Sequence, residues 1–312
     1  MTKQVYIPED IAPVGKKFLT DKGYDVKVGT GTDEATILRE GADADGIILR
    51  TSKFTKTIID GLPNVKVIAR HGVGFDNVDL KAATADKIWV TITPLANASS
   101  VAETTLTLLL MLAKNVRNDS LQMAAGNFDY KKTHKGMDLD GKTLGILGYG
   151  KIGKMLAEKV SGLNMKVLIY DPLVHTAERG ELVSREEVLS QSDFISLHLP
   201  ATAETKGTIG AAEFKQMKPT AYLMNIARGS IIDEPALIEA LKAGEFAGAA
   251  LDVYSQEPLP LDSPLFKMDN VLLTPHIASN TNETMDRMAL HVAMEVDRVL
   301  SGEKPSWPVN KI

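Results

Sequence analysis

Short runs of apolar, mostly β-branched residues recur along the first third of the chain, and polar stretches of helix length separate them. The runs occupy residues 5–7, 25–28, 46–49, 65–69 and 89–91. Strands that alternate with helix-length segments indicate βαβ units, whose strands lie parallel in one sheet. The pattern predicts one α/β domain in this part of the chain.

A second series of apolar runs occupies residues 144–147, 166–170, 194–197, 221–225, 247–252 and 271–274. Six strands with helices between them match a doubly wound dinucleotide-binding domain. Residues 283–300 then predict a terminal helix that returns to the first domain. The fold class expected is α/β, with two doubly wound parallel-sheet domains.

The alternation breaks at residues 93–97, which contain Pro94. Directly afterwards, Ser100 and Glu103 have the spacing of a capping box that opens a long apolar helix through Met111. A proline-containing break before a capped helix is typical of a crossing between domains.

We therefore expect hinges near Asn97 and Ser279. The first domain would comprise residues 1–97, completed by residues 283–312, and bind substrate, while residues 98–282 would form the nucleotide domain. Closure at such hinges would exclude water from a bound substrate.

Composition narrows the classes of partner. The chain has 312 residues and is 44% hydrophobic, which suffices for two buried cores. Its net charge of -5 and pI near 5.8 provide no broad positive surface for nucleic acid or an acidic membrane. We expect a small-molecule ligand, with no nucleic acid and no membrane as partner.

The chain contains no cysteine, which excludes disulfides, thiolate metal sites and a cysteine nucleophile. No metal site is predicted. The N-terminus lacks the apolar core of a signal peptide, and the longest apolar stretch, residues 106–113, is too short to span a bilayer. These features predict a cytoplasmic protein.

A glycine motif follows the apolar run at residues 144–147, with the sequence Gly148-Tyr149-Gly150-Lys151-Ile152-Gly153. Gly148 permits a tight turn, Gly150 lets the backbone approach a pyrophosphate, and Gly153 lets the following helix pack against the strand. Amides at the start of that helix would meet the phosphates. The motif predicts a dinucleotide site that includes Lys151 and Ile152.

Asp171 ends the next predicted strand, at about the spacing of ~20 residues expected for a contact to the cofactor's ribose. A carboxylate there accepts hydrogen bonds from ribose hydroxyls and repels the 2′-phosphate of NADP, so NAD is the expected cofactor. The alternative is that Asp171 only caps a turn before Pro172. His175 lies just beyond and would tolerate a phosphate.

Three further residues follow predicted strands and form a candidate catalytic group. Arg228 ends the strand before Gly229, and a guanidinium suits a 2-oxo acid because its fork can hold a carboxylate. His276 follows the last strand and is the best general acid or base among six histidines. Glu257 lies between them and would favour the cationic imidazole. The alternatives are that Arg228 forms only a surface ion pair and that His276 has only a structural role.

Together these motifs resemble the D-isomer-specific 2-hydroxyacid dehydrogenase family. The resemblance covers nearly the whole chain, through residues 70–79, the glycine motif with Asp171, and residues 225–229, 251–258 and 274–278. It implies a Rossmann NAD-binding domain inserted into a flavodoxin-like substrate domain. It also implies hydride transfer between NAD and a small 2-hydroxy or 2-oxo acid.

The resemblance assigns roles to individual residues. Arg228 would clamp the substrate, His276 would donate or accept the proton, and Glu257 would orient His276. The substrate carboxylate would meet the backbone around His71, Gly72, Val73 and Gly74. The nicotinamide end of the cofactor would be lined by Val73, Ile226, Ala227, Arg228, Asp252 and His276.

The identity of the 2-hydroxy acid stays open. Arg50 follows a strand and resembles a phosphate-binding position of phosphoglycerate dehydrogenases, although it would equally pair with a carboxylate. The chain ends at Ile312, without room for the regulatory C-terminal domain of longer members. A phosphoglycerate- or hydroxypyruvate-like substrate is one expectation, and glyoxylate reductases and D-lactate-type enzymes are others.

The resemblance further implies a homodimer, with the apolar helix after Ser100 at its interface. A different class of function is a NAD-sensing corepressor, because corepressors that use the same scaffold retain similar motifs. The compact chain lacks the long disordered tails of such binding proteins, so an enzyme is favoured.

Overall fold

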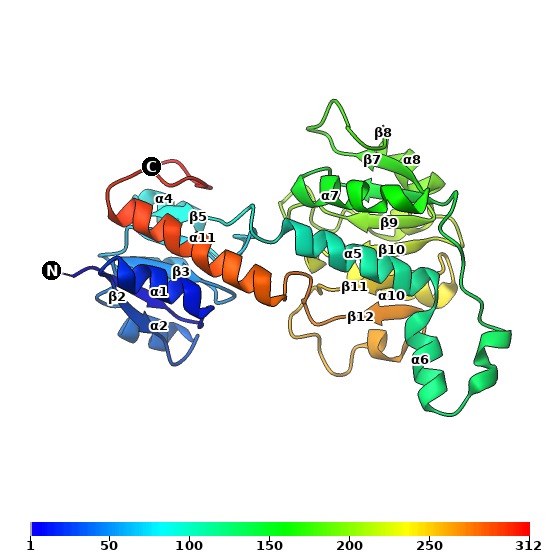
Figure 1. The fold of residues 1–312 in the computed structure, drawn as a ribbon, viewed down its shortest axis with the longest axis horizontal. Helices are drawn as coiled ribbons and strands as arrows, with labels where there is room; N and C mark the ends of the chain where they lie inside the picture. Colours follow the sequence, from blue (N-terminus) through cyan, green and yellow to red (C-terminus); the bar gives the residue numbers. More distant parts are fainter. Residues whose placement is uncertain (1) are drawn as a thin grey trace. The chain divides into compact units, whose positions relative to one another are not determined.

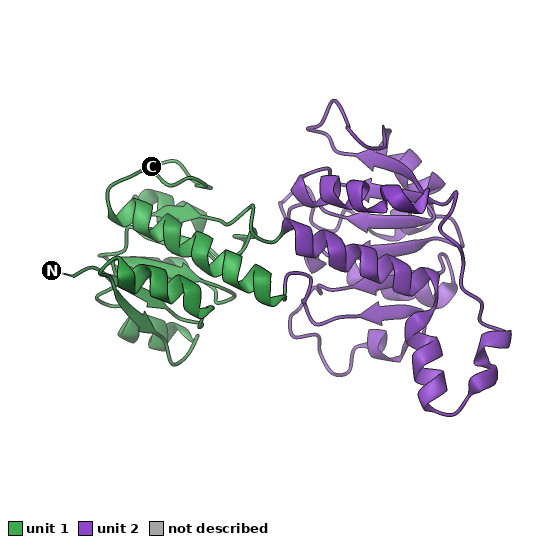
Figure 2. Cartoon of the chain, in the orientation of Figure 1, with its two compact units in different colours: residues 1–97, 280–312 green, residues 98–279 purple. Residues whose placement is uncertain are grey.

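Two parallel sheets organise the protein, and each belongs to its own compact unit (Figure 2). The computed structural model describes residues 2–312. Unit 1 contains the chain up to Asn97 together with Asn280–Ile312, and unit 2 is Ala98–Ser279. Among the described residues, no helix combines the length and apolar character needed to cross a membrane.

Within the described residues, unit 1 has a five-stranded parallel sheet in the order β2-β1-β3-β4-β5, which is the flavodoxin-like order. Its strands are β1 Gln4–Ile7, β2 Asp25–Val28, β3 Gly46–Leu49, β4 Val67–Arg70 and β5 Trp89–Thr91. Its helices are α1 Pro13–Asp21, α2 Glu34–Glu40, α3 Lys56–Asp60, α4 Leu80–Ala85 and α11 Asn282–Leu300.

Both faces of this sheet are buried because successive side chains of a strand point to opposite sides. Val5 and Ile7 of β1 pack in the cluster that contains residues of α1 and α11, and those two helices run side by side (Figure 1). Tyr6 between them packs in the cluster of α2, α3 and α4. The terminal helix therefore completes unit 1.

Unit 2 has a parallel sheet in the order β12-β11-β10-β9-β6-β7-β8, the Rossmann arrangement with an added strand at one edge. Its strands are β6 Thr143–Leu147, β7 Lys166–Tyr170, β8 Glu181–Leu182, β9 Phe194–Leu197, β10 Tyr222–Asn225, β11 Gly248–Leu251 and β12 Val271–Leu273. The prediction of six strands is wrong by one: across the described chain this sheet has seven. The missed strand, β8, has only two residues, neither of which is buried, so it carries no apolar signal.

The α-helices of unit 2 are α5 Ala98–Ala113, α6 Val116–Ala124, α7 Lys151–Lys159, α8 Arg185–Gln191, α9 Ala211–Phe214 and α10 Glu234–Ala243. Its 3₁₀ helices are η1 Phe128–Lys132, η2 Val160–Leu163, η3 Gly229–Ile231 and η4 Pro264–Lys267. Side chains of α5 and α7 cover one face of the sheet, and those of α8, α9 and α10 cover the other.

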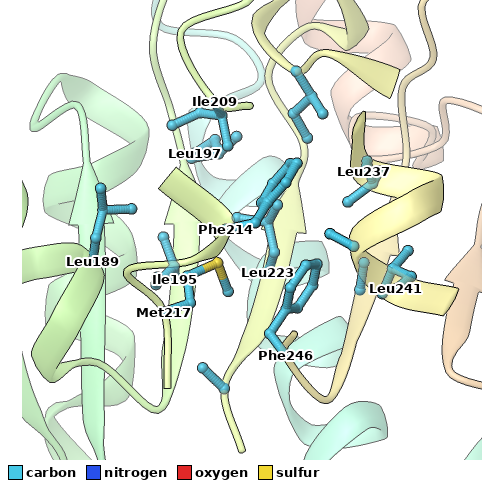
Figure 3. Packing of buried hydrophobic residues seen from close by; sticks show 14 of the residues in the cluster. Leu189, Ile195, Leu197, Ile209, Phe214, Met217, Leu223, Leu237, Leu241 and Phe246 are labelled. Carbon is cyan, nitrogen blue, oxygen red and sulfur yellow. The ribbon is translucent and has the colours of Figure 1, made fainter. Parts of the chain in front are cut away.

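Aromatic and branched side chains fill the second of these faces (Figure 3). Phe214 and Phe246 are fully buried, with ring centroids 5.4 Å apart, beside Leu223 of the inner strand β10. Truncating a buried phenylalanine to alanine typically costs about 3–5 kcal/mol of stability. This packing fixes the strands whose carboxyl ends carry the candidate site.

The start of α5 corrects one prediction. The helix begins at Ala98, so Ser100 is its third residue and does not cap it. The Ser99 hydroxyl instead donates to Glu103 Oε1 at 3.0 Å, four residues on, and Lys159 of α7 donates to the same oxygen at 3.0 Å. Glu103 therefore ties α5 to α7, and the expected capping box at Ser100 is wrong.

Candidate active site

The glycine motif forms the turn between β6 and α7, and close contacts explain two of its glycines. Gly148 has a φ of +98°, and a Cβ there would lie 2.7 Å from the carbonyl oxygen of His198. A Cβ on Gly153 would lie 2.4 Å from the Gly148 carbonyl oxygen. Any larger residue would therefore push the turn and the helix apart.

Gly150 stands in a different environment. A Cβ at this position would meet no atom of the described chain within 4 Å, and no side chain caps α7, which begins at Lys151. The open space lies in front of the helix N-terminus, where amides favour anions. The residues present therefore fit the pyrophosphate of a dinucleotide.

Asp171 directly follows β7, and main-chain amides hold both of its carboxylate oxygens. Tyr149 of the glycine motif donates its amide to Oδ2 at 2.8 Å, and Leu173 donates its amide to Oδ1 at 2.9 Å. The carboxylate thus caps its own turn and also contacts the glycine motif. The sequence leaves two interpretations of Asp171 open, a contact to the cofactor's ribose and a cap of the turn before Pro172, and this geometry is compatible with both.

Arg228 lies in the loop after β10, and a buried amide side chain shapes that loop. Asn225, 1% exposed, donates Nδ2 to the Arg228 carbonyl at 2.9 Å and accepts the Ala227 amide at 3.1 Å. Arg228 itself donates Nη1 to the Ala227 carbonyl at 2.7 Å. Asn225 therefore fixes the main chain from which the guanidinium extends.

His276 and Glu257 form a direct pair, with Nδ1 2.8 Å from Oε2. The other carboxylate oxygen accepts the Tyr254 amide at 3.1 Å. Both side chains are partly exposed, 47% for His276 and 38% for Glu257, so a ligand can reach the imidazole. The sequence predicted these two residue types at strand ends, and the structure brings them together.

The pair shifts both pKa values in the directions that favour a charged pair. The hydrogen bond and charge of Glu257 raise the pKa of His276 against the opposing effect of burial. Burial works to raise the pKa of Glu257, but the hydrogen bond and charge of His276 outweigh it and lower that pKa. His276 can therefore hold a proton at a pH where an isolated imidazole loses it.

The segment that carries His276 is held by Asp252, which is fully buried. Its carboxylate accepts the Thr274 hydroxyl at 2.6 Å, the Ile277 amide at 2.8 Å and the Ala278 amide at 2.9 Å. These bonds bracket His276, whose φ of 54° is rare for a residue with a side chain. Asp252 thus positions His276 through the main chain.

Tyr254 connects the loops that carry Glu257 and His276, and the sequence analysis did not single it out. Its hydroxyl lies 3.0 Å from the Leu251 carbonyl and 2.8 Å from the Thr274 carbonyl, and its amide holds Glu257. A Cβ on Gly229 would lie 1.9 Å from the Tyr254 carbonyl carbon, so only glycine fits there. Burial and the charge of Asp252 raise the pKa of Tyr254 to about 12, which keeps its hydroxyl a donor.

The predicted substrate segment belongs to unit 1. The Gly72 carbonyl accepts the Thr93 amide at 2.8 Å, and the Gly74 carbonyl accepts Arg70 Nε at 2.7 Å. Val73 between them is 37% exposed. The turn is therefore fixed through its carbonyls and presents the Val73 side chain outward.

His71 is buried, and its Nε2 has no hydrogen-bond partner among the described residues. Burial and the nearby Arg50 charge lower the pKa of His71 to about 4, so the imidazole is neutral. Arg50 Nη1 donates to the Asp10 carbonyl at 2.8 Å. The carboxylate of Glu9 accepts the amides of Thr51 and Ser52 at 2.8 and 2.6 Å, which fixes the loop after Arg50.

Residues 106–278 match the family model described as D-isomer specific 2-hydroxyacid dehydrogenase, NAD binding domain. The chain belongs to the D-isomer specific 2-hydroxyacid dehydrogenase family. The matched segment begins within α5 and contains the glycine motif, Asp171, Arg228, Glu257 and His276. The NAD-binding domain of this family therefore corresponds to unit 2.

Relatives in the family carry more than one name. D-3-phosphoglycerate dehydrogenase of Archaeoglobus fulgidus is 38% identical over 305 residues, covering 96% of this chain and 58% of the relative. Glyoxylate reductase of Thermococcus litoralis is 37% identical over 327 residues, covering 100% of this chain and 98% of the relative. The chain thus spans less than two thirds of the first relative's length.

A solved structure of a glyoxylate/hydroxypyruvate reductase has the same fold. The NADPH-dependent glyoxylate/hydroxypyruvate reductase from Sinorhizobium meliloti, in complex with NADP and malonate, shares it with a TM-score of 0.90 at 27% identity. The match covers 99% of this chain and 97% of that protein. The architecture of both units is therefore that of this dehydrogenase family.

Proposed function

We propose that this dehydrogenase-family protein is an NAD-dependent oxidoreductase that interconverts a D-2-hydroxy acid and its 2-oxo acid. The observation that carries the proposal is the 2.8 Å pair of His276 and Glu257 in the same unit as the glycine motif. A proton donor with a raised pKa and a dinucleotide turn are the two elements that reduction of a carbonyl requires.

His276 moves the proton. Its Nδ1 is engaged by Glu257, which leaves Nε2 to face the substrate. In reduction, the protonated imidazole donates from Nε2 to the carbonyl oxygen, and in oxidation the neutral imidazole removes the hydroxyl proton. Glu257 stabilises the cationic form and holds the ring in one orientation.

Arg228 binds the substrate and stabilises charge. Its guanidinium carries donors that suit a carboxylate and the oxygen that becomes negative during reduction. Because Asn225 fixes the Arg228 main chain, the charge is placed before substrate arrives. In unit 1, the proposal assigns substrate contacts to Arg50 and to His71, Gly72, Val73 and Gly74.

NAD, when bound, supplies or accepts the hydride. Gly148, Gly150, Lys151, Ile152 and Gly153 hold its pyrophosphate in this proposal, and Asp171 accepts its ribose hydroxyls. Nicotinamide contacts are assigned to Val73, Ile226, Ala227, Arg228, Asp252 and His276. Since a 2′-phosphate would meet the carboxylate of Asp171, the proposal favours NAD over NADP.

The substrate is a small 2-oxo acid. The names of the relatives point to glyoxylate, hydroxypyruvate and phosphohydroxypyruvate as the first compounds to test. A phosphate would need the positive charge of Arg50, whereas glyoxylate would need only Arg228 and the turn at residues 72–74.

A panel of 2-oxo acids tests the function. The oxidation of NADH is followed with glyoxylate, hydroxypyruvate, phosphohydroxypyruvate, pyruvate, 2-oxoisocaproate and 2-oxoglutarate. We expect turnover with at least one acid, and His276→Gln should lower kcat about 100-fold or more while NADH still binds, since general acid catalysis contributes about 10²–10⁴-fold. Tight NADH binding without turnover of any acid would contradict the proposal.

We also propose a homodimer formed through unit 2. Helices α6 and η1 extend away from the sheet of this unit (Figure 1), and they carry apolar side chains with high exposure. Leu121 is 55% exposed, Met123 60% and Phe128 61%. A second copy would cover them. Light scattering should give about twice the chain mass of 33.8 kDa, and Phe128→Asp should lower it toward one chain.

A further inference from the structure

Tyr149 occupies an unusual position for a glycine-motif residue. It stands between Gly148 and Gly150, in the turn that we assign to the cofactor, yet its side chain is only 2% exposed. The ring packs in the core cluster of α5 and α7, which also contains Leu156 and Ile169. The side chain therefore points away from the turn and into unit 2.

A loop of residues 171–180 joins β7 to β8 (Figure 1). Tyr149 contacts this loop near both of its ends. Its amide donates to Asp171 Oδ2 at 2.8 Å, at the start of the loop. Its hydroxyl donates to the Arg179 carbonyl at 3.1 Å and lies 3.4 Å from the Arg179 amide, near the end of the loop. One residue thus fixes the two ends of residues 171–179.

Between these anchors, Val174 and Ala177 pack against the core cluster of unit 2, and the anchors hold the two ends of the loop. Most of residues 172–178 are exposed, and the Leu173 amide that bonds to Asp171 lies within two residues of the first anchor. The loop carries His175 and Arg179 as well as Glu178. The segment thus carries basic side chains together with the Asp171 carboxylate.

We propose that Tyr149 is a positioning residue that sets the preference for NAD over NADP by holding the loop of residues 171–179. This inference rests on the proposed function, which places the dinucleotide at the glycine motif. With both anchors made, Asp171 faces the ribose hydroxyls and repels a 2′-phosphate. Without the Arg179 anchor, the loop can bring His175 and Arg179 toward that phosphate.

The hydroxyl can be tested apart from the ring. Tyr149→Phe keeps the aromatic ring in the core and the amide bond to Asp171, and it removes only the contact to Arg179. A matched control is Tyr24→Phe in unit 1, which removes a tyrosine hydroxyl 2.9 Å from Asp297 Oδ1. Each variant loses the two hydrogen bonds of one part-buried tyrosine hydroxyl, so their general loss of stability should be similar.

Titration of nucleotide fluorescence gives the Kd of NADH and of NADPH for each protein. One hydrogen bond is typically worth enough to change an affinity about 2- to 10-fold. For Tyr149→Phe we expect the Kd of NADH to rise by this factor and the ratio of the NADPH Kd to the NADH Kd to fall by at least as much. Tyr24→Phe should leave both Kd values unchanged.

Three outcomes would overturn the inference. Unchanged affinities in Tyr149→Phe would show that the Arg179 anchor is dispensable. Equal weakening of NADH and NADPH would indicate a structural role without discrimination. Absence of NADH binding to the parent protein would overturn the proposed function first, and the inference with it.

Discussion

At the scale of single residues, main-chain hydrogen bonds determine the chemistry of the candidate site. His276 has a left-handed φ of 54°, a conformation that costs a residue with a side chain of order 1–3 kcal/mol. Asp252 compensates by accepting the amides of Ile277 and Ala278. The imidazole lies beside Glu257, whose hydrogen bond is the largest cause of its raised pKa.

Glu257→Gln should move the pH profile of the reaction. His276 must be protonated for reduction, and its pKa is raised by Glu257, so reductive turnover falls as pH rises through that raised pKa. Without the carboxylate the pKa of His276 falls, and the loss of turnover should begin at lower pH. The measurement is kcat/KM for the best 2-oxo acid from pH 5 to pH 9.

Glu213→Gln is a matched control, since Glu213 pairs with Arg185 at 3.2 Å and lies in a different segment of unit 2. Its pH midpoint should equal that of the parent protein. If Glu257→Gln also kept the parental midpoint, Glu257 would not be the group that sets the basicity of His276.

Residue types were easier to predict than residue contacts. Arg228, Glu257 and His276 could be chosen from the sequence because each follows a strand, and strand ends converge at one edge of a parallel sheet. The role of Asp252 as a support for residues 274–278 was not predicted. It depends on which amides the fold brings to a buried carboxylate, and the sequence carries no local signal for that.

At the scale of elements, Tyr254 joins three strand-end loops. Its hydroxyl bonds the carbonyls of Leu251 and Thr274, its amide holds Glu257, and its main chain lies against Gly229, beside Arg228. The loops after β10, β11 and β12 therefore have a common support. A change in this support should affect the placement of His276 more than the binding of the cofactor.

Tyr254→Phe should lower kcat and leave the Kd of NADH unchanged. The substitution keeps the ring and the amide but frees two carbonyls, at a typical cost of about 0.5–1.5 kcal/mol of stability. An increase of the same size in the activation free energy corresponds to about a 2- to 10-fold loss in kcat. Steady-state kinetics and NADH titration separate the two effects.

Tyr6→Phe controls for a lost tyrosine hydroxyl, because Tyr6 lies in unit 1 and its hydroxyl is 3.2 Å from Glu40 Oε2. We expect comparable destabilisation with parental kcat. A parental kcat in Tyr254→Phe as well would show that the three loops keep their places without the hydroxyl.

Elements with a strong apolar pattern were predicted to within one or two residues, and the errors have local causes. The strand β8 has two residues, so no alternation can form. The start of α5 was placed at Ser100 because serine and glutamate three residues apart resemble a capping box, whereas the helix already begins at Ala98. The Glu103 carboxylate accepts from Ser99 and from Lys159 of α7, and the local sequence pattern does not reveal the second contact.

At the scale of the whole molecule, each unit has buried clusters on both faces of its own sheet. Both tryptophans, Trp89 and Trp307, belong to unit 1, whereas the glycine motif belongs to unit 2. Tryptophan emission therefore reports the unfolding of unit 1, and calorimetry reports both units. Because the two signals differ in the units that they report, a comparison of their melting temperatures shows which unit a ligand stabilises.

NAD should raise the melting temperature of unit 2. At a concentration 100-fold above its Kd, a ligand that binds only the folded state adds about 2.7 kcal/mol, which for a domain of this size corresponds to a shift of about 5–10 °C. At the same NAD concentration, Asp171→Ala should reduce this shift, because the Asp171 carboxylate is assigned to the ribose. If NAD raised the melting temperature by the same amount in tryptophan emission and in calorimetry, the two units would unfold together. If NAD did not change the calorimetric melting temperature at any concentration, the cofactor assignment would be contradicted.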